Sequence, residues 1–312
     1  MEIMELLGSC HLCPRECGVN RLAGERGFCG LAGSGVRVAR AALHFWEEPC
    51  ISGENGSGTV FFAGCTLRCI FCQNQAISRG EAGVEISVER LAEIFLELEQ
   101  KGAANINLVT PTHYLPQIVT ALDRAREAGL SLPVVYNTSG YERPEMLRLL
   151  EGRVDIYLPD AKYASEELAG SFSHAADYPR VLLPTLDEMV RQTGTPAFDE
   201  NGMMRKGTII RHLALPGQGA DSRRLLRLLY ERYGEQVYFS IMSQYTPPSA
   251  PLPVESLNRK LSRREYDRLL DYAISLGMEQ AFIQEGGAAS ESFIPPFDLE
   301  GVEKSPPSEK MS

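Results

Sequence analysis

Three features are scarce in this sequence, and each scarcity argues against a class of protein. Basic residues are outnumbered, with 31 Lys and Arg against 41 Asp and Glu, and the formal net charge of −10 argues against charge-driven binding to nucleic acid or to a membrane surface. No apolar run approaches the roughly 18 residues of a spanning helix. The first residues carry early acids rather than the basic start of a secretory signal. We therefore expect a cytoplasmic enzyme without a nucleic-acid or membrane partner.

Cysteine is missing from the 312 − 72 = 240 positions after residue 72, so all eight cysteines lie near the start of the chain. A disulfide framework is typical of small secreted domains, whereas a chain of this length can bury a core without one. Clustered thiols in a cytosolic chain more often bind metal. They form two groups and a lone residue: C-x3-C-x2-C at Cys65, Cys69 and Cys72; C-x2-C-x3-C-x11-C at Cys10, Cys13, Cys17 and Cys29; and Cys50.

Composition divides the chain into three segments. Residues 1–50 are Cys-rich and irregular and are expected to bind metal, and residues 301–312 have the composition of a flexible tail. Residues 51–300 alternate short β-branched runs with amphipathic stretches, which is typical of βα units. The expected strands are 59–62, 105–109, 133–136, 154–158, 208–213, 236–242 and 280–284, and the expected helices are 87–101, 115–128, 144–150, 222–233 and 263–276, with a further helical stretch ending near residue 190.

This alternation predicts an α/β fold: a partial (β/α) barrel of about six βα units, preceded by the Cys-rich N-terminal extension. A doubly wound sheet is the alternative. In a parallel barrel, functional residues gather at the carboxyl ends of the strands. The polar residues that follow each expected strand are therefore the first candidates for a functional site.

The C-x3-C-x2-C group directly follows the first expected strand, and Phe71 stands just before its third cysteine. Three thiolates cannot fill a [4Fe–4S] cluster, so one iron stays open to a substrate or cofactor. Zinc held by three cysteines and a fourth ligand from elsewhere is the alternative from the cysteines alone.

The stretch Cys65-x3-Cys69-x-Phe71-Cys72, continued through Asn74, resembles the signature of radical S-adenosylmethionine (SAM) enzymes. More narrowly, the chain is similar over nearly all of its length to the branch related to pyruvate formate-lyase activating enzyme. The resemblance implies that the three cysteines hold a [4Fe–4S] cluster whose fourth iron is chelated by SAM. It also implies reductive cleavage of SAM to a 5′-deoxyadenosyl radical that abstracts hydrogen. A reductant such as flavodoxin or ferredoxin and an anaerobic setting are expected with such a cluster.

Candidate SAM contacts follow the second and third expected strands. Many members of the family have a Gly-Gly-Glu motif after the second strand, where it receives the SAM amino group, and this chain has Thr110 and Thr112 there instead. Their hydroxyl and carbonyl oxygens are acceptors for the same group. His113 is a candidate for proton transfer, and a helix-start histidine bound to local backbone is the alternative. Asn137 and Ser139 suit contacts to a ribose, with ordinary loop chemistry as the alternative.

Charged candidates follow the fourth and fifth strands. A period of two places Asp160 and Lys162 on one face, where the pair is costly to bury unless it is mutually satisfied or meets a ligand. The pair resembles the Asp-x-Lys element of glycyl-radical-enzyme activases, in which the lysine approaches the SAM carboxylate, and this makes Lys162 a catalytic candidate as well as a cofactor ligand. Arg211 offers a donor fork to a carboxylate.

The four thiols at Cys10, Cys13, Cys17 and Cys29 suit either a structural zinc or a complete second [4Fe–4S] cluster. A single C-x2-C pair favours the cluster, and the absence of any stable metal is the third alternative. Cys50 is an alternative ligand to Cys29, although a small buried hydrophobe is the simpler interpretation.

The main hypothesis is a radical SAM enzyme that activates a glycyl radical enzyme, which would make its substrate a protein. An alternative within the same chemistry is modification of a peptide or a small metabolite. A hypothesis from another class is a non-catalytic metal-binding or redox-sensing protein, which predicts that SAM does not bind.

Overall fold

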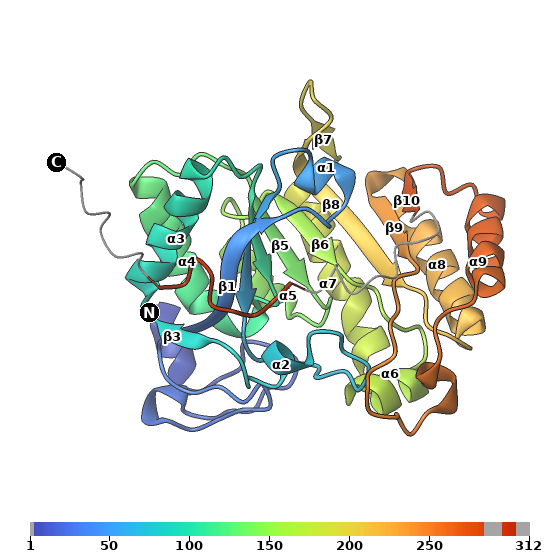
Figure 1. Ribbon diagram of the computed structural model, residues 1–312, viewed down its shortest axis with the longest axis horizontal. Helices are drawn as coiled ribbons and strands as arrows, with labels where there is room; N and C mark the ends of the chain where they lie inside the picture. The colour runs from blue at the N-terminus through green and yellow to red at the C-terminus, as the bar shows by residue number, and fades with distance from the viewer. Residues whose placement is uncertain (1–2, 284–294, 304–312) are drawn as a thin grey trace.

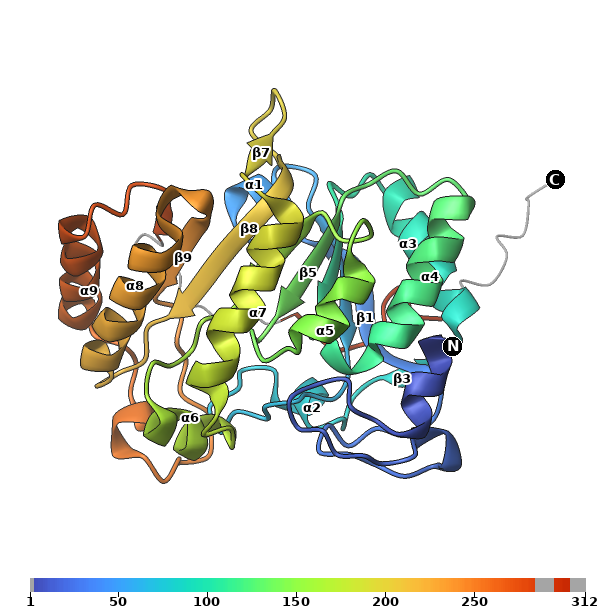
Figure 2. The same ribbon diagram turned by 180° about the vertical axis from the view of Figure 1, so that it is seen from behind.

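The computed structural model describes residues 3–283 and 295–303 (Figures 1 and 2). One sheet runs through these residues in the order β10-β9-β8-β6-β5-β4-β2-β1-β3, and β7 pairs with β8 beside this path. Its strands are β1 (Val36–His44), β2 (Ser57–Phe62), β3 (Val84–Ile86), β4 (Ile106–Val109), β5 (Val134–Thr138), β6 (Ile156–Pro159), β7 (Ala197–Phe198), β8 (Met204–Leu213), β9 (Tyr238–Met242) and β10 (Ala281–Ile283).

Strands β2, β4, β5, β6, β8, β9 and β10 are parallel and pair in chain order. A doubly wound sheet reverses its strand order at a switch point, and this order does not reverse, so the alternative architecture is excluded. The path ends at β3 and β10, which are not paired with each other in the described residues. The expected partial barrel is therefore confirmed.

Helices connect the parallel strands and cover one face of the sheet, which Figure 2 shows for α4, α5, α7 and α8. The sequence forms α3 because Ser87 caps its first turn and every third or fourth residue of the helix is apolar and buried. The helices are α1 (Pro49–Ser52), α2 (Gln75–Ser78), α3 (Val88–Gln100), α4 (Leu115–Glu127), α5 (Pro144–Leu147), α6 (Glu166–Ser173), α7 (Tyr178–Thr193), α8 (Gly219–Tyr233) and α9 (Arg263–Ser275).

Short 3-10 helices complete the described structure: η1 (Ile3–Gly8), η2 (Arg21–Ala23), η3 (Thr112–Tyr114), η4 (Arg148–Leu150), η5 (Gly234–Gln236) and η6 (Glu255–Asn258). The expected helix at 144–150 divides into α5 and η4, and the stretch ending near residue 190 divides into α6 and α7. The expected last strand is β10, and Gln284 lies outside the described residues.

The predicted boundary at residue 50 needs correction, because β1 belongs to the sheet. It pairs antiparallel with both β2 and β3. The sequence analysis did not predict this strand, because two arginines interrupt its apolar pattern. Arg37 donates from Nε to the carbonyl of Gly83 over 2.9 Å, and Arg40 pairs with Asp298 over 2.6 Å, so both charges are satisfied beside an otherwise apolar strand.

The predicted flexible tail is wrong for residues 301–303. Val302 is fully buried, and its carbonyl accepts from Arg90 Nε over 3.1 Å. The preceding residues lie along β1, where Ala41 N donates to the carbonyl of Glu300 over 2.8 Å. Residues 304–312 lie outside the described residues. Among the helices that the structure describes, none combines the length and the apolar character needed to span a membrane.

Candidate active site

A cavity of about 240 Å³ opens where the parallel strands end. It is lined by all three cysteines of the C-x3-C-x2-C loop, which follows β2. Most of the side chains expected from the strand ends also line it: Thr110, Asn137, Ser139, Asp160, Lys162 and Arg211. The carboxyl-end rule for parallel strands thus brings together residues that are up to 146 positions apart (211 − 65).

The three-cysteine loop is held by close packing and by a hydrogen bond to sulfur. Ser173 Oγ donates to Cys69 Sγ over 2.9 Å. Gly64, just before the loop, has a φ of 86°, and a Cβ there would lie 2.7 Å from Leu31 Cδ1, so only glycine fits. Burial raises the pKa of Cys72 to about 12, so binding a metal releases protons from this loop.

The donor set fits an open [4Fe–4S] cluster. Three soft thiols line one cavity, and the charge of Cys65 adds to burial in raising the pKa values of Cys69 and Cys72. A zinc site needs a fourth ligand. In the described ranges, no three Cys, His, Asp or Glu side chains, those of the two cysteine groups included, are grouped at the spacing of a single-ion site. When bound, the cluster supplies an electron and one open iron, and Cys65, Cys69 and Cys72 are the residues that would hold it.

Asp160 is the centre of an ion-pair network at the wall of the cavity. Lys162 Nζ lies 2.8 Å from its Oδ2, and Arg211 Nε lies 3.0 Å from its Oδ1. Asp160 and Arg211 are neighbours because β6 and β8 are parallel and a bridge joins these two residues. Burial raises the pKa of Asp160, but the charges of Lys162 and Arg211 outweigh burial and lower it. The pair therefore stays ionised in the cavity wall.

Glu47 completes this network, and the sequence analysis missed it. Its Oε2 lies 2.9 Å from Arg211 Nη1, and its Oε1 accepts from the side-chain amides of Asn107 and Asn137, each over 3.1 Å. Arg211 Nη2 donates to Asn137 Oδ1 over 2.6 Å. Glu47 comes from the loop after β1, which is antiparallel. The carboxyl-end rule therefore gave no signal for it.

The adjacent Glu48 behaves differently. It is buried, its Oε2 has no hydrogen-bond partner in the described residues, and burial raises the pKa of this carboxyl. Two neighbouring acids thus differ in role. Glu47 pairs with Arg211 over 2.9 Å, and burial holds Glu48 toward its neutral form.

Thr110 lines the cavity in a strained conformation. Its φ is 61°, and its amide donates to the carbonyl of Asn137 over 2.9 Å. The left-handed region is unfavourable for a β-branched residue, by about 1–3 kcal/mol, and such strain collects at functional sites.

Thr112 and His113 do not line the cavity, because η3 turns them toward the core. Thr112 Oγ1 donates to Glu142 Oε1 over 2.6 Å. His113 is buried with its Nε2 2.9 Å from the carbonyl of Ala63, and burial lowers the pKa of this imidazole to about 3. Neither residue therefore joins the other candidates at the cavity wall. The contact of His113 agrees with the alternative of a histidine bound to backbone.

Cys50 lies apart from both thiol groups. It packs in a core cluster with Ile51, Val135 and Ile156. It is a small buried hydrophobe, as the simpler interpretation held, and it does not replace Cys29.

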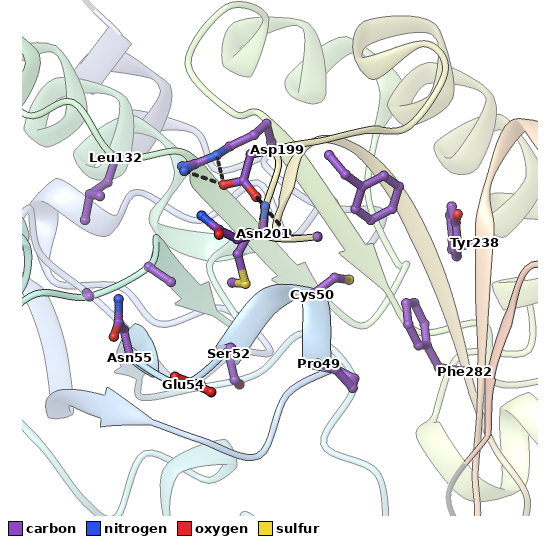
Figure 3. Close-up of a pocket in the computed structure, with 17 residues that line it drawn as sticks. Pro49, Cys50, Ser52, Glu54, Asn55, Leu132, Asp199, Asn201, Tyr238 and Phe282 are labelled. Carbon is purple, nitrogen blue, oxygen red and sulfur yellow. Dashed lines mark hydrogen bonds and ion pairs between the residues drawn. The ribbon is translucent and has the colours of Figure 1, made fainter.

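A larger pocket of about 880 Å³ lies at the amino ends of the parallel strands, between the α1 segment and the β7 hairpin (Figure 3). Tyr238 and Phe282 form one side of it, and Asp199, which pairs with Arg205 over 2.7 Å, lies on the hairpin. It contains no cysteine from either group, and this end of a parallel barrel serves stability rather than chemistry. The candidate active site is therefore the smaller cavity.

The chain is 28% identical over 274 residues to the uncharacterized protein MJ0674 of Methanocaldococcus jannaschii, covering 85% of this chain and 74% of that one. It is 28% identical over 173 residues to the uncharacterized protein MJ0808 of the same organism, covering 47% of this chain and half of that one.

Among solved structures, the chain is similar to a radical SAM methyltransferase from Sphaerobacter thermophilus, with a TM-score of 0.49 and 15% identity over 73% of this chain and 66% of that one. It is also similar to Streptococcus suis SuiB bound to S-adenosylmethionine, with a TM-score of 0.49 and 14% identity over 72% of this chain and 49% of that one. The family model of the Radical SAM superfamily matches residues 59–229, which is more than half of the chain. This protein therefore belongs to the radical SAM superfamily, which implies a [4Fe–4S] cluster and SAM as its cofactors.

Proposed function

We propose that this protein cleaves SAM reductively at the three-cysteine cavity and abstracts hydrogen from a protein substrate. The observation that carries the proposal is the shared cavity, in which three cluster-type thiols face the Asp160–Lys162–Arg211 network. When bound, the cluster and SAM supply the 5′-deoxyadenosyl radical. The chain's own residues bind and orient the cofactor.

The charge network suits the methionyl part of SAM, which carries one carboxylate and one ammonium group. Lys162 and Arg211 offer cations, and Asp160 and Glu47 offer anions. Each of these two SAM groups replaces a partner of like charge, so the side chains that lose a partner gain another of the same sign. We propose that Lys162 binds the carboxylate. Glu47 takes the place of the missing Gly-Gly-Glu acid and accepts from the ammonium.

Neutral groups along the same wall serve the nucleoside part. Asn137 and Ser139 follow β5 and line the cavity, where amide and hydroxyl groups suit a ribose. Thr110 adds a hydroxyl and a backbone carbonyl on the neighbouring strand end. The strain at Thr110 is consistent with a position selected for binding.

A protein substrate, such as a glycyl radical enzyme, is supported by the surface beside the cavity. Phe45 and Trp46 are each 51% exposed, and Trp46 also lines the cavity. Exposed aromatic side chains are enriched where proteins bind each other. The resemblance of Asp160-x-Lys162 to the activase element points the same way. A low-potential flavodoxin or ferredoxin is the proposed electron donor.

The test is SAM cleavage by the anaerobically reconstituted and reduced protein, followed as 5′-deoxyadenosine and methionine. We expect product from the wild type and from Cys50→Ala, whose buried thiol lies outside both groups. We expect none from Cys65→Ala. A protein that binds metal but neither binds nor cleaves SAM would overturn the proposal in favour of a metal-binding or redox-sensing role.

The substrate is tested separately. A glycyl radical signal on a candidate partner protein, dependent on SAM and on Cys65, supports the activase version. Steady turnover of a small metabolite, with no radical on any candidate partner, would replace it with the small-molecule alternative.

A further inference from the structure

The four cysteines of the N-terminal segment gather in one place. Backbone hydrogen bonds close residues 10–19 into a loop, with Cys10 N donating to the carbonyl of Val19 over 2.9 Å. Phe28 N donates to Cys17 Sγ over 3.4 Å, which brings the segment containing Cys29 against this loop. A Cβ on Gly27 would lie 3.2 Å from Cys17 Sγ, so the turn that leads to Cys29 packs directly on this thiol. The two turns that carry the four thiols are therefore packed against each other.

Three arginines beside the four-cysteine segment have carbonyl or aromatic partners but no carboxylate partner within residues 3–283 and 295–303. Arg21 lies over the Tyr114 ring, 5.8 Å from its centroid. Arg21 is fully buried, and its Nε and Nη2 have no hydrogen-bond partner in the described chain. Only its Nη1 is bonded, to the carbonyl of His113 over 2.5 Å. Among the described residues, no carboxylate pairs with Arg21, Arg15 or Arg68. A buried guanidinium without an anion is costly, so the fold must supply negative charge nearby.

The thiols can supply that charge only when they are ionised. Four neutral thiols carry no charge. Four thiolates around Zn²⁺ or around a [4Fe–4S]²⁺ core carry a formal charge of about −2 in either case. Gly33 N donates to the carbonyl of Arg21 over 2.8 Å, which folds the residues after Cys29 back onto the Arg21 segment. A metal centre therefore resolves both the gathered thiols and the unpaired arginine.

We propose that Cys10, Cys13, Cys17 and Cys29 bind a second metal centre through four thiolates, with Arg21 as its buried counter-ion. The proposal names a thiophilic centre, zinc or [4Fe–4S], which the test distinguishes. It is independent of SAM cleavage, because none of these cysteines lines the cavity.

The proposed centre sits against the three-cysteine loop. Arg15, between two of its ligands, donates from Nε to the carbonyl of Thr66 over 2.9 Å and from Nη2 to the carbonyl of Ser173 over 3.1 Å. The hydroxyl of Ser173 in turn donates to Cys69. Arg15 also lies over the Phe28 ring, 4.0 Å from its centroid. A metal bound to the four-cysteine segment would therefore also hold the three-cysteine loop in place. Figure 2 shows the N-terminal segment beside α2.

The test separates the two sites by removing one at a time from the full chain. The variant Cys65→Ala, Cys69→Ala, Cys72→Ala loses the first site. We expect it to retain about one zinc per chain, or about four iron with matching sulfide, after anaerobic reconstitution with each metal. Retention of iron and sulfide identifies a second cluster, and retention of zinc identifies a structural zinc site. No retained metal would overturn the proposal.

The second variant adds Cys17→Ser in the same background. Cys17 is exposed, so its replacement removes a ligand without disturbing the core. We expect the remaining metal to be lost, whereas Cys50→Ser in the same background keeps it. Full retention after Cys17→Ser would contradict the four-thiolate assignment. A circular dichroism spectrum equal to that of the parent variant establishes that the fold survives.

Arg21→Met tests the counter-ion. We expect the second centre to bind about 10-fold more weakly, read as faster transfer of metal to a chelator in the triple-alanine background. Equal transfer rates would overturn the role of Arg21 while leaving the ligand assignment to the Cys17→Ser result. Neither outcome depends on SAM cleavage, so failure here and failure of the proposed function are distinguishable.

Discussion

The two cysteine groups of this chain lie side by side and differ in what surrounds them. The three-cysteine loop opens onto a cavity whose wall carries Asp160, Lys162 and Arg211, charges that already satisfy one another. The four-cysteine segment contains instead the buried Arg21, a cation with no carboxylate partner in the described residues. The two groups also differ in the number of thiols, with three at the cavity and four in the N-terminal segment. Three ligands leave a coordination position for a cofactor, and four close the centre.

The charge around a thiol group indicates whether the group binds an exchangeable cofactor or a closed metal centre. A balanced network next to an incomplete ligand set is ready to exchange partners with a zwitterionic ligand. An unbalanced cation next to a complete ligand set indicates a permanent anionic centre. Arg15 lies in the four-cysteine segment and donates to the carbonyls of Thr66 and Ser173, so the closed centre that we propose would support the open one.

The largest expected effect comes from substituting one ligand in each group. Cys69→Ala removes a ligand of the open site, and we expect 5′-deoxyadenosine formation to fall to the background of a mixture without enzyme. Cys17→Ser leaves the open site complete, and we expect measurable product to remain. The measurement is chromatographic quantification of 5′-deoxyadenosine from both variants with the same reductant. Equal loss of product in both variants would contradict the distinction between the two cysteine groups.

Glu142 lies between the two regions and gives a pH-dependent effect. Burial raises the pKa of this carboxyl to about 7, from an unfolded value near 4.5. The unfolded chain therefore releases this proton at lower pH than the folded chain. Stability is highest below the unfolded pKa and falls as pH rises, by about 3 kcal/mol once pH passes 7.

The measurement is urea unfolding between about pH 5 and pH 8 for the wild type and for Glu142→Gln. The variant keeps the hydrogen bonds from Thr112 and Thr138 but does not titrate. We expect its stability to lack this decline. An identical pH profile in both proteins would contradict the assignment.

Lys162→Met tests the cation proposed to bind the SAM carboxylate. Loss of one charge-assisted hydrogen bond is worth about 2 kcal/mol, which corresponds to about 30-fold weaker SAM binding. Lys206→Met is the matched control, because Lys206 is exposed on β8 and outside the cavity. Equilibrium binding of SAM is the measurement, and equal affinity in the two variants would remove Lys162 from the binding site.

The smallest effect separates two adjacent acids. Glu47→Gln weakens the pairing with Arg211 and should cost about 1.5 kcal/mol in stability and a similar amount in SAM affinity. Glu48→Gln replaces a carboxyl already held toward its neutral form, so we expect a change within about 0.5 kcal/mol. Unfolding and binding titrations on both variants check the contrast, which reversed sensitivities would contradict.

Much of the fold followed from sequence periodicity. The parallel strands and the longer helices between residues 59 and 283 match the alternation of β-branched runs and amphipathic stretches, because both patterns report which face is buried. The short elements α2, β3 and β7 were not predicted. Strand β1 was not predicted, because Arg37 and Arg40 interrupt its apolar pattern and have partners only in the folded chain. Residues 301–303 were predicted to belong to a flexible tail, because a polar composition does not reveal packing against Arg90.

The site divides in the same way. Asp160, Lys162 and Arg211 were predictable, since parallel strands bring their carboxyl ends together. Glu47 was not, because it reaches the network from a loop after an antiparallel strand. The place of His113 was not predictable, because η3, a single short turn, decides whether it faces the cavity or the core.

The most direct test of the central claim, that only the three-cysteine site opens to SAM, is electron paramagnetic resonance of reduced protein with and without SAM. We predict that the Cys17→Ser variant gives a cluster signal that changes when SAM is added. In the Cys65→Ala, Cys69→Ala, Cys72→Ala variant, any remaining cluster signal should stay unchanged. A signal that responds to SAM in the triple variant, or one that ignores SAM in Cys17→Ser, would contradict the account.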